Sequence, residues 1–90
     1  MKIEFDGDKR VLTLRHRRLD MARAAEVFAG PTLTVKDDRT EYGENRYISI
    51  GHLDGRMVVL VWTPRGAARR IISLRKANAR EQKIYGPRLG

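Results

Sequence analysis

The segment from Met57 to Trp62 consists of six consecutive apolar residues, and it constrains the fold more than any other stretch. A strand with one wet face alternates apolar and polar residues. An unbroken apolar run therefore predicts a central strand that is covered on both faces of a sheet. A turn at Pro64-Arg65-Gly66-Ala67 and a second β-branched-rich run, from Arg69 to Lys76, follow it. Together these segments predict an antiparallel hairpin.

The second run of this hairpin is expected to be only partly buried. Side chains alternate across a strand. Alternation places Ile72 and Leu74 on one face, and the other face then carries Arg69, Ile71, Ser73 and Arg75. Because this second set mixes charged and apolar side chains, we expect function there.

The other elements are predicted from caps, periodicity and turn residues. Met21 to Ala29 is predicted as a helix, because Asp20 is a good N-cap, apolar residues recur at helical spacing and Gly30-Pro31 ends the pattern. Further strands are expected at 33–35 and 46–51, an exposed acidic loop at 36–45, a tight turn at 54–55 and a last helix at 78–85. In that helix Asn78 and Glu81 have the spacing of a capping box.

Residues 8–16 allow two interpretations. They form either a hairpin with Ile3-Glu4-Phe5 across the turn at Asp6-Gly7-Asp8, or a helix capped by Asp8. The whole pattern predicts one α+β domain over residues 1–90, with about four antiparallel strands and helices before and after them.

The charge is large and uneven. Lys and Arg total 19, of which 14 are Arg, against 11 acidic residues, for a net charge of +8. Residues 65–90 contain eight basic residues and one acid, Glu81. Arginine holds phosphate oxygens with a planar fork, so this distribution indicates nucleic acid first and an anionic partner protein second.

Composition also limits the class of protein. The chain has no cysteine, which excludes disulfides and thiolate metal sites. Met1-Lys2-Ile3-Glu4-Phe5 does not resemble a signal peptide, and the longest apolar run is too short to span a bilayer. We therefore expect a cytoplasmic protein that does not contact membranes.

Several motifs together resemble the BrnT toxin family. The main ones are Tyr42-Gly43-Glu44-Asn45-Arg46, Ile50-Gly51, Leu53-Asp54-Gly55-Arg56, Thr63-Pro64-Arg65-Gly66 and 70–77, followed by Glu81 and Tyr85. The resemblance continues upstream through Phe5-Asp6, Lys9, Leu19-Asp20, Ala24-Ala25 and Val27-Phe28. It implies a small ribonuclease toxin, an endoribonuclease that inhibits translation, with a fold similar to RelE. It also implies a ribbon-helix-helix antitoxin (BrnA-like) that blocks the toxin and binds operator DNA.

The resemblance selects the helix for residues 8–16, and hence two N-terminal helices and one C-terminal helix around the four-stranded sheet. The family commonly shows Lys-His-Gly just before the second helix, where this chain has His16-Arg17-Arg18. The expected His is Arg17 and the expected Gly is Arg18. Three interpretations follow: His16 acts from one position away, that histidine is dispensable, or this member is impaired.

A ribonuclease of this kind needs neither a metal nor another cofactor, because RNA can be cleaved by attack of its own 2′-hydroxyl on the neighbouring phosphorus. The protein then supplies a base, an acid and charge stabilisation. No group of His, Asp and Glu has metal-ligand spacing; the adjacent Asp37 and Asp38 are expected to be solvated. The catalytic candidates are His16, Glu44, Arg46, Arg65, Arg70 and Arg75. The candidates for RNA binding are Arg69, Lys76, Arg80, Lys83 and Tyr85.

Each of these residues also has an ordinary structural explanation. His16 and Glu44 are the candidate bases, yet a histidine at an exposed helix end and a glutamate in a loop salt bridge are the more common explanations of such residues. Arg70 shares strand parity with Ile72 and Leu74, so it is a candidate partner for Glu44. The alternative function is a basic module that binds nucleic acid without cutting it. Such sheets usually present two or three stacking aromatics, whereas here Tyr47 alone alternates on a strand.

Overall fold

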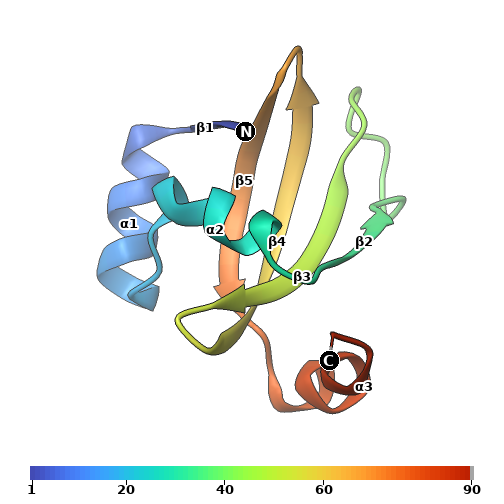
Figure 1. The fold of residues 1–90 in the computed structure, drawn as a ribbon. Coiled ribbons are helices and arrows are strands. Elements are labelled where there is room, and N and C mark those ends of the chain that lie inside the picture. Colours follow the sequence, from blue (N-terminus) through green and yellow to red (C-terminus); the bar gives the residue numbers. More distant parts are fainter. Residues whose placement is uncertain (90) are drawn as a thin grey trace.

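Five strands form one mixed sheet, and three α-helices and a short 3₁₀ helix pack around it (Figure 1). The computed structural model describes residues 1–89. Its elements are β1 (Lys2–Phe5), α1 (Gly7–Arg17), η1 (Met21–Arg23), α2 (Ala24–Ala29), β2 (Leu33–Lys36), β3 (Tyr47–Leu53), β4 (Arg56–Arg65), β5 (Ala68–Lys76) and α3 (Ala79–Leu89). The order of strands across the sheet is β1-β5-β4-β3-β2.

The predicted α+β class is confirmed, but the prediction of four antiparallel strands is wrong. β1 is a fifth strand and pairs in parallel with β5, from Lys2 opposite Ala68 to Phe5 opposite Ile71. Hairpin rules apply only to strands that are close in sequence. They could not predict this pairing, because the partner of β1 lies near the other end of the chain. The expected similarity to RelE stays a prediction.

β4 is the middle strand, as its apolar run predicted. Val58 and Leu60 are 0% exposed and Trp62 is 8% exposed. The indole N–H of Trp62 donates to Ser49 Oγ at 2.8 Å, which satisfies both buried polar groups. The predicted hairpin with β5 is confirmed by antiparallel pairing that runs from Arg65 opposite Ala68 to Val58 opposite Lys76.

A β-bulge overturns the predicted faces of β5. Val61 pairs with Ser73 but the next residue, Trp62, pairs with Ile71, so Ile72 is an extra residue on β5. Ile71 and Leu74 therefore both enter the core beside α2, although they are three positions apart. The predicted face of Arg69, Ile71, Ser73 and Arg75 is thus divided between the two sides of the sheet. Simple alternation cannot anticipate the extra residue.

Helix α1 confirms the choice made for residues 8–16, although its N-cap is Asp6 and not Asp8. The Asp6 carboxylate accepts the backbone N–H groups of Asp8 and Lys9. The helix lies along the part of β5 that β1 does not pair. There Lys9 Nζ donates to the carbonyl of Ile72 at 3.4 Å and Arg17 Nη1 to that of Leu74 at 2.9 Å. These basic side chains thus bind carbonyl groups that would be unpaired at an uncovered strand edge.

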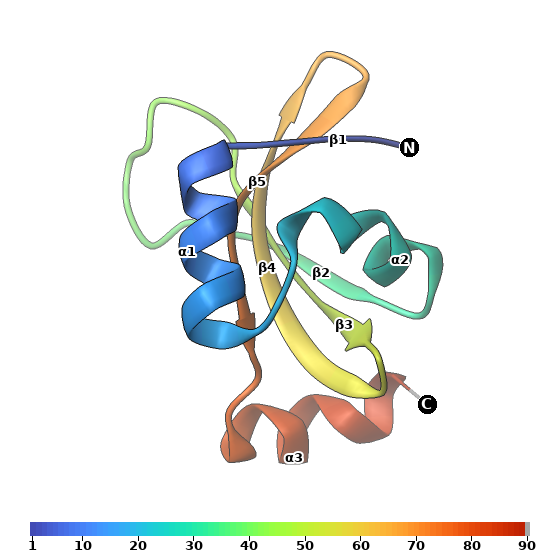
Figure 2. The same cartoon turned by 90° about the vertical axis from the view of Figure 1, so that its left-hand side faces the viewer.

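Helix α2 covers one face of the sheet at close range (Figure 2). The predicted helix from Met21 begins as η1, whose N-cap Asp20 accepts the N–H of Ala22, and continues as α2. A Cβ at Gly51 of β3 would lie 2.7 Å from Val27 Cγ1, so the helix packs directly on the strand at this glycine. The first core cluster, with Trp62, Ile71 and Leu74, fills this layer.

Helix α3 covers the lower end of the opposite face and is longer than predicted. It continues through Gly86 and Pro87 to Leu89, where a stop after Tyr85 was expected. Leu89 is buried with Ile50, Met57, Val59 and Ala77, and this packing supports the final turn in spite of the proline. The predicted capping box is confirmed: Asn78 and Glu81 exchange side-chain to backbone hydrogen bonds of 2.9 and 2.8 Å. None of the helices within residues 1–89 has the length and apolarity needed to cross a membrane.

Arg18 ends α1 in the left-handed region, with φ of 56°, and this conformation costs a non-glycine residue roughly 1–2 kcal/mol. We predict that Arg18→Gly raises the free energy of unfolding by about 0.5–1 kcal/mol, the remainder being lost to the greater freedom of glycine in the unfolded chain. Urea denaturation measures the change. Arg18→Ala is the control, since it removes the same charge but keeps Cβ. Equal stabilisation by both variants would attribute the effect to charge instead of backbone conformation.

Candidate nucleic-acid interface

The face of the sheet opposite α2 is only partly covered and contains a groove. α3 covers its lower end and the loop of residues 37–46 borders its upper part (Figure 2). The groove has a volume of about 320 Å³ and is lined by Val35, Arg39, Ile48, Ile50, Val59, Val61, Ser73, Arg75, Glu81 and Tyr85. We call it the sheet groove. It has an apolar floor of strand residues and a charged rim.

Arg75 is fixed at the groove by Glu81. Its Nη1 and Nη2 donate to the two carboxylate oxygens, each at 2.8 Å, although the Arg75 side chain remains 43% exposed. The hydrogen bonds from Arg75 lower the pKa of Glu81 to about 2, against the opposing effect of burial, and the N–H of Asn78 adds to the lowering. The same pair raises the pKa of Arg75. The capping box of α3 thus also holds a predicted catalytic arginine in place.

Arg39 is a groove residue that sequence reasoning missed. Its Nε and Nη2 donate to the carboxylate oxygens of Asp37 at 2.8 and 2.7 Å. The Asp37 side chain is 0% exposed and also accepts the hydroxyl of Tyr42 at 3.1 Å. These bonds, above all those from Arg39, hold the pKa of Asp37 at about 2. The expectation that Asp37 is solvated was therefore wrong. The only local sequence signal of this two-bond Arg39–Asp37 pair is the Asp-x-Arg spacing, and that signal is weak.

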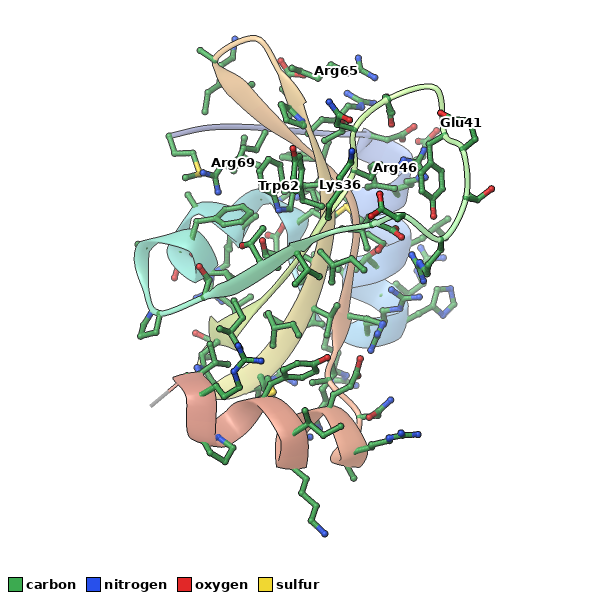
Figure 3. The ribbon with its side chains drawn as sticks, turned by 90° about the vertical axis from the view of Figure 1, so that its right-hand side faces the viewer. Lys36, Glu41, Arg46, Trp62, Arg65 and Arg69 are labelled. Atoms are coloured by element: carbon green, nitrogen blue, oxygen red, sulfur yellow. The ribbon has the colours of Figure 1, made fainter. Side chains whose placement is uncertain are left out.

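Tyr42 joins this network to the upper end of the same face. The guanidinium of Arg46 lies over its ring, 4.1 Å from the centroid, and Arg46 Nε donates to Glu44 at 3.1 Å. Arg65 lies at the hairpin turn (Figure 3). Its Nη2 is 3.8 Å from the other carboxylate oxygen of Glu44. Glu44 therefore contacts Arg46 and Arg65, and not the Arg70 that sequence parity offered as its partner. Arg70 lies between Glu4 of β1 and Thr63 of β4 in the sheet.

His16 lies at a second hollow beside the groove. This hollow, of about 470 Å³, is lined by Lys9, Leu12, Thr13, His16, Arg17, Ile72 and Ser73. Ser73 lines both spaces, so the histidine and the sheet groove are on the same side of the molecule. Arg17, at the position where the resemblance expects histidine, instead donates to the Leu74 carbonyl. The structure thus places His16 at a hollow that shares Ser73 with the sheet groove, and Arg17 donates a hydrogen bond at the sheet edge.

The predicted RNA-binding residues are dispersed. Arg69 is on the α2 side, with its guanidinium 4.5 Å from the ring centroids of both Phe28 and Trp62 (Figure 3). Tyr85 of α3 lines the sheet groove. Lys76, Arg80 and Lys83 are exposed at the end of β5 and on α3. Of this set, Tyr85 alone lines the groove. The bulge in β5 places Arg69 on the other face of the sheet, and the remaining residues are exposed to solvent.

Within residues 1–89, no three His, Asp, Glu or Cys side chains come together in a group that could hold a metal ion. A comparison with protein-family models found that the model described as ribonuclease toxin, BrnT, of type II toxin-antitoxin system matches residues 5–81. This range runs from the end of β1 into the first turn of α3. No match was found among curated proteins.

The Arg75–Glu81 pair predicts a measurable titration. We expect Glu81 to titrate near its lowered pKa of about 2, and in Arg75→Gln we expect the pKa to rise toward the ordinary value of 4.5. Because the folded pKa is the lower one, the pair stabilises the protein above about pH 4.5 and the stabilisation is lost as the pH falls toward 2. Carboxyl-detected NMR measures the shift. The control is Asp37, whose pKa should not follow that of Glu81; an unchanged Glu81 in the variant would contradict the assigned cause.

Proposed function

Because the chain belongs to the BrnT family of ribonuclease toxins of type II toxin–antitoxin systems, we propose that it is an endoribonuclease that cleaves RNA without a metal ion and so inhibits translation. Membership of this family implies an RNA target and an antitoxin partner. We further propose that the antitoxin is a ribbon-helix-helix protein that binds operator DNA, and that the pair acts in the cytoplasm. The sheet groove with Arg75 at its rim is the observation that supports placing the reaction there.

The proposed reaction is attack of an RNA 2′-hydroxyl on the neighbouring phosphorus, which forms a 2′,3′-cyclic phosphate as the P–O5′ bond breaks and the leaving 5′-oxygen takes up a proton from water. Removing the hydroxyl proton needs a base, and His16 is our candidate because it lines the hollow that Ser73 connects to the groove. The transition state carries extra negative charge on the phosphate oxygens. We assign the stabilisation of this charge to Arg75, which lines the groove, with each well-placed donor typically worth about 10²–10³-fold in rate.

The arginines at the upper end of the face are proposed to guide the RNA strand. Arg65 is 53% exposed and lies farther from Glu44 than Arg46 does, so it is available to a phosphate. Arg70 pairs with Thr63, and Thr63 points to the same side of β4 as the groove residue Val61, so Arg70 lies on the groove face. Glu44, in contact with two arginines, is better explained as the residue that orients them than as a base.

We predict that the purified chain cleaves single-stranded RNA in excess EDTA and leaves 2′,3′-cyclic phosphate ends, because the 2′-hydroxyl is the attacking group. Gel analysis of end-labelled RNA, with mass spectrometry of the products, measures both features. A substrate with 2′-O-methyl groups is the control and should remain intact. Strict dependence on added Mg²⁺ would contradict the metal-free reaction, and binding without cleavage would favour the non-catalytic nucleic-acid-binding module.

A second prediction concerns the base. His16→Gln should lower the cleavage rate by about 10²-fold or more, because it removes the proposed base. The matched control is His52→Gln, since His52 is exposed on β3 and does not line the groove or the hollow. Rates are measured across pH with the fluorescence of a dual-labelled RNA. Equal rates for the two variants would remove His16 from the mechanism.

A further inference from the structure

Arg39 and Arg75 reach the sheet groove from different parts of the chain. Arg39 belongs to the loop after β2, and Arg75 lies at the C-terminal end of β5, yet both line the same groove. The two guanidinium groups are close enough for the positive charge of Arg39 to oppose the raised pKa of Arg75. Two like charges at one groove repel each other, and an anion between them relieves that repulsion.

Each guanidinium is held by a carboxylate through two of its N–H groups, and Arg75 Nη1 also donates to the carbonyl of Lys76 at 3.4 Å. Asp37 accepts two N–H groups of Arg39, and Glu81 accepts two of Arg75. A guanidinium carries five N–H donors, so each arginine keeps donors for a further acceptor. Arg39 is 68% exposed while its carboxylate partner is buried. The forks thus fix the orientation of both groups before any ligand arrives, which reduces the entropy cost of binding.

The floor between these arginines suits a nucleoside. The exposed Val35 and the half-buried Ile48 and Val61 provide an apolar surface over the buried Ile50 and Val59, and Tyr85 adds an aromatic ring and Ser73 a hydroxyl. Bases of single-stranded RNA are commonly bound by stacking on aromatic side chains, with basic residues along the phosphates. The groove volume of about 320 Å³ is within the usual range for small-ligand sites.

We propose that Arg39 and Arg75 together clamp one phosphodiester group of single-stranded RNA, with the attached nucleoside on the apolar floor of the sheet groove. Asp37 is a positioning residue in this arrangement, because its buried carboxylate directs Arg39 into the groove. The inference rests on the proposed function for its choice of ligand. It adds to that function a phosphate contact from Arg39, a residue of the loop 37–46 that was not among the predicted site residues.

The test measures binding separately from cleavage. The probe is a short, fluorescein-labelled single-stranded RNA with 2′-O-methyl groups throughout, which cannot undergo attack by the 2′-hydroxyl. Fluorescence anisotropy at several salt concentrations gives the dissociation constant and its salt dependence. Arg39→Ala should weaken binding by about tenfold and reduce the slope of log K against log salt by about 0.7, the value for one lost contact to a single-stranded phosphate.

Arg56→Ala is the matched control for charge. It removes one arginine at the β3–β4 turn, where the guanidinium donates to the carbonyl of Arg18 and does not line the groove. Binding and salt slope should stay within about twofold of the unaltered protein. Equal weakening by Arg39→Ala and Arg56→Ala would overturn the clamp, because it would show an effect of net charge alone.

Asp37→Asn tests whether Asp37 positions Arg39, because general electrostatics and the proposed geometry predict opposite changes in the affinity for RNA. The substitution raises the net positive charge, so a purely electrostatic surface would bind the RNA probe more tightly. Loss of the fork should instead weaken binding severalfold, with a changed Arg39 Nε–Hε resonance in NMR spectra. Tighter binding would overturn the role of Asp37.

The outcomes separate the two proposals. If Arg39→Ala weakens binding of the 2′-O-methyl probe but unmodified RNA is never cleaved, the clamp stands and the catalytic proposal fails. If unmodified RNA is cleaved while Arg39→Ala leaves affinity and salt slope unchanged, the catalytic proposal stands and the clamp is overturned.

Discussion

Strand β4 places apolar side chains on both faces of the sheet, and the helices are arranged around the need to cover both. On one face, Val58, Leu60 and Trp62 pack in the cluster that α2 completes. On the other, Met57 and Val59 pack with Leu89 of α3. α3 covers the lower end of this second face, and the sheet groove lies next to it, over Ile48 and Val61 as well as the buried Val59. The site thus occupies the part of a two-sided strand that the small chain leaves open.

The bulge at Ile72 decides which arginines reach that open face. On one side of it, Ser73 and Arg75 line the groove; on the other, Arg69 and Ile71 turn to the covered face. Arg69 then lies over the rings of Phe28 and Trp62 and has an aromatic environment in place of a phosphate. One extra residue therefore separates basic side chains that a regular strand would present together.

Carboxylates orient the arginines around the groove. Glu81 holds Arg75, Asp37 holds Arg39, and Glu44 lies between Arg46 and Arg65. Tyr42 connects two of these groups, since its hydroxyl donates to Asp37 and its ring lies under Arg46. Because the arginines of these ion pairs remain partly exposed, the pairs add little to stability, but they fix flexible side chains in one direction. The acids near the basic groove thus serve its geometry more than the neutralisation of charge.

The sequence by itself determined the elements whose signals are local. The apolar run of β4, the turn before β5, the capping box of Asn78 and Glu81 and the family motifs were all readable, because each depends on neighbouring residues. Only the tertiary structure decided the parallel pairing of β1 with β5, the continuation of α3 through Pro87 to the buried Leu89 and the faces of β5. It also decided that Asp37 is buried and bonded to Arg39 and Tyr42, because the loop of residues 37–46 closes on itself, with the N–H of Asp37 donating to the carbonyl of Arg46. Partners distant in sequence and a single inserted residue leave no periodic signal, and the candidate site depends on both.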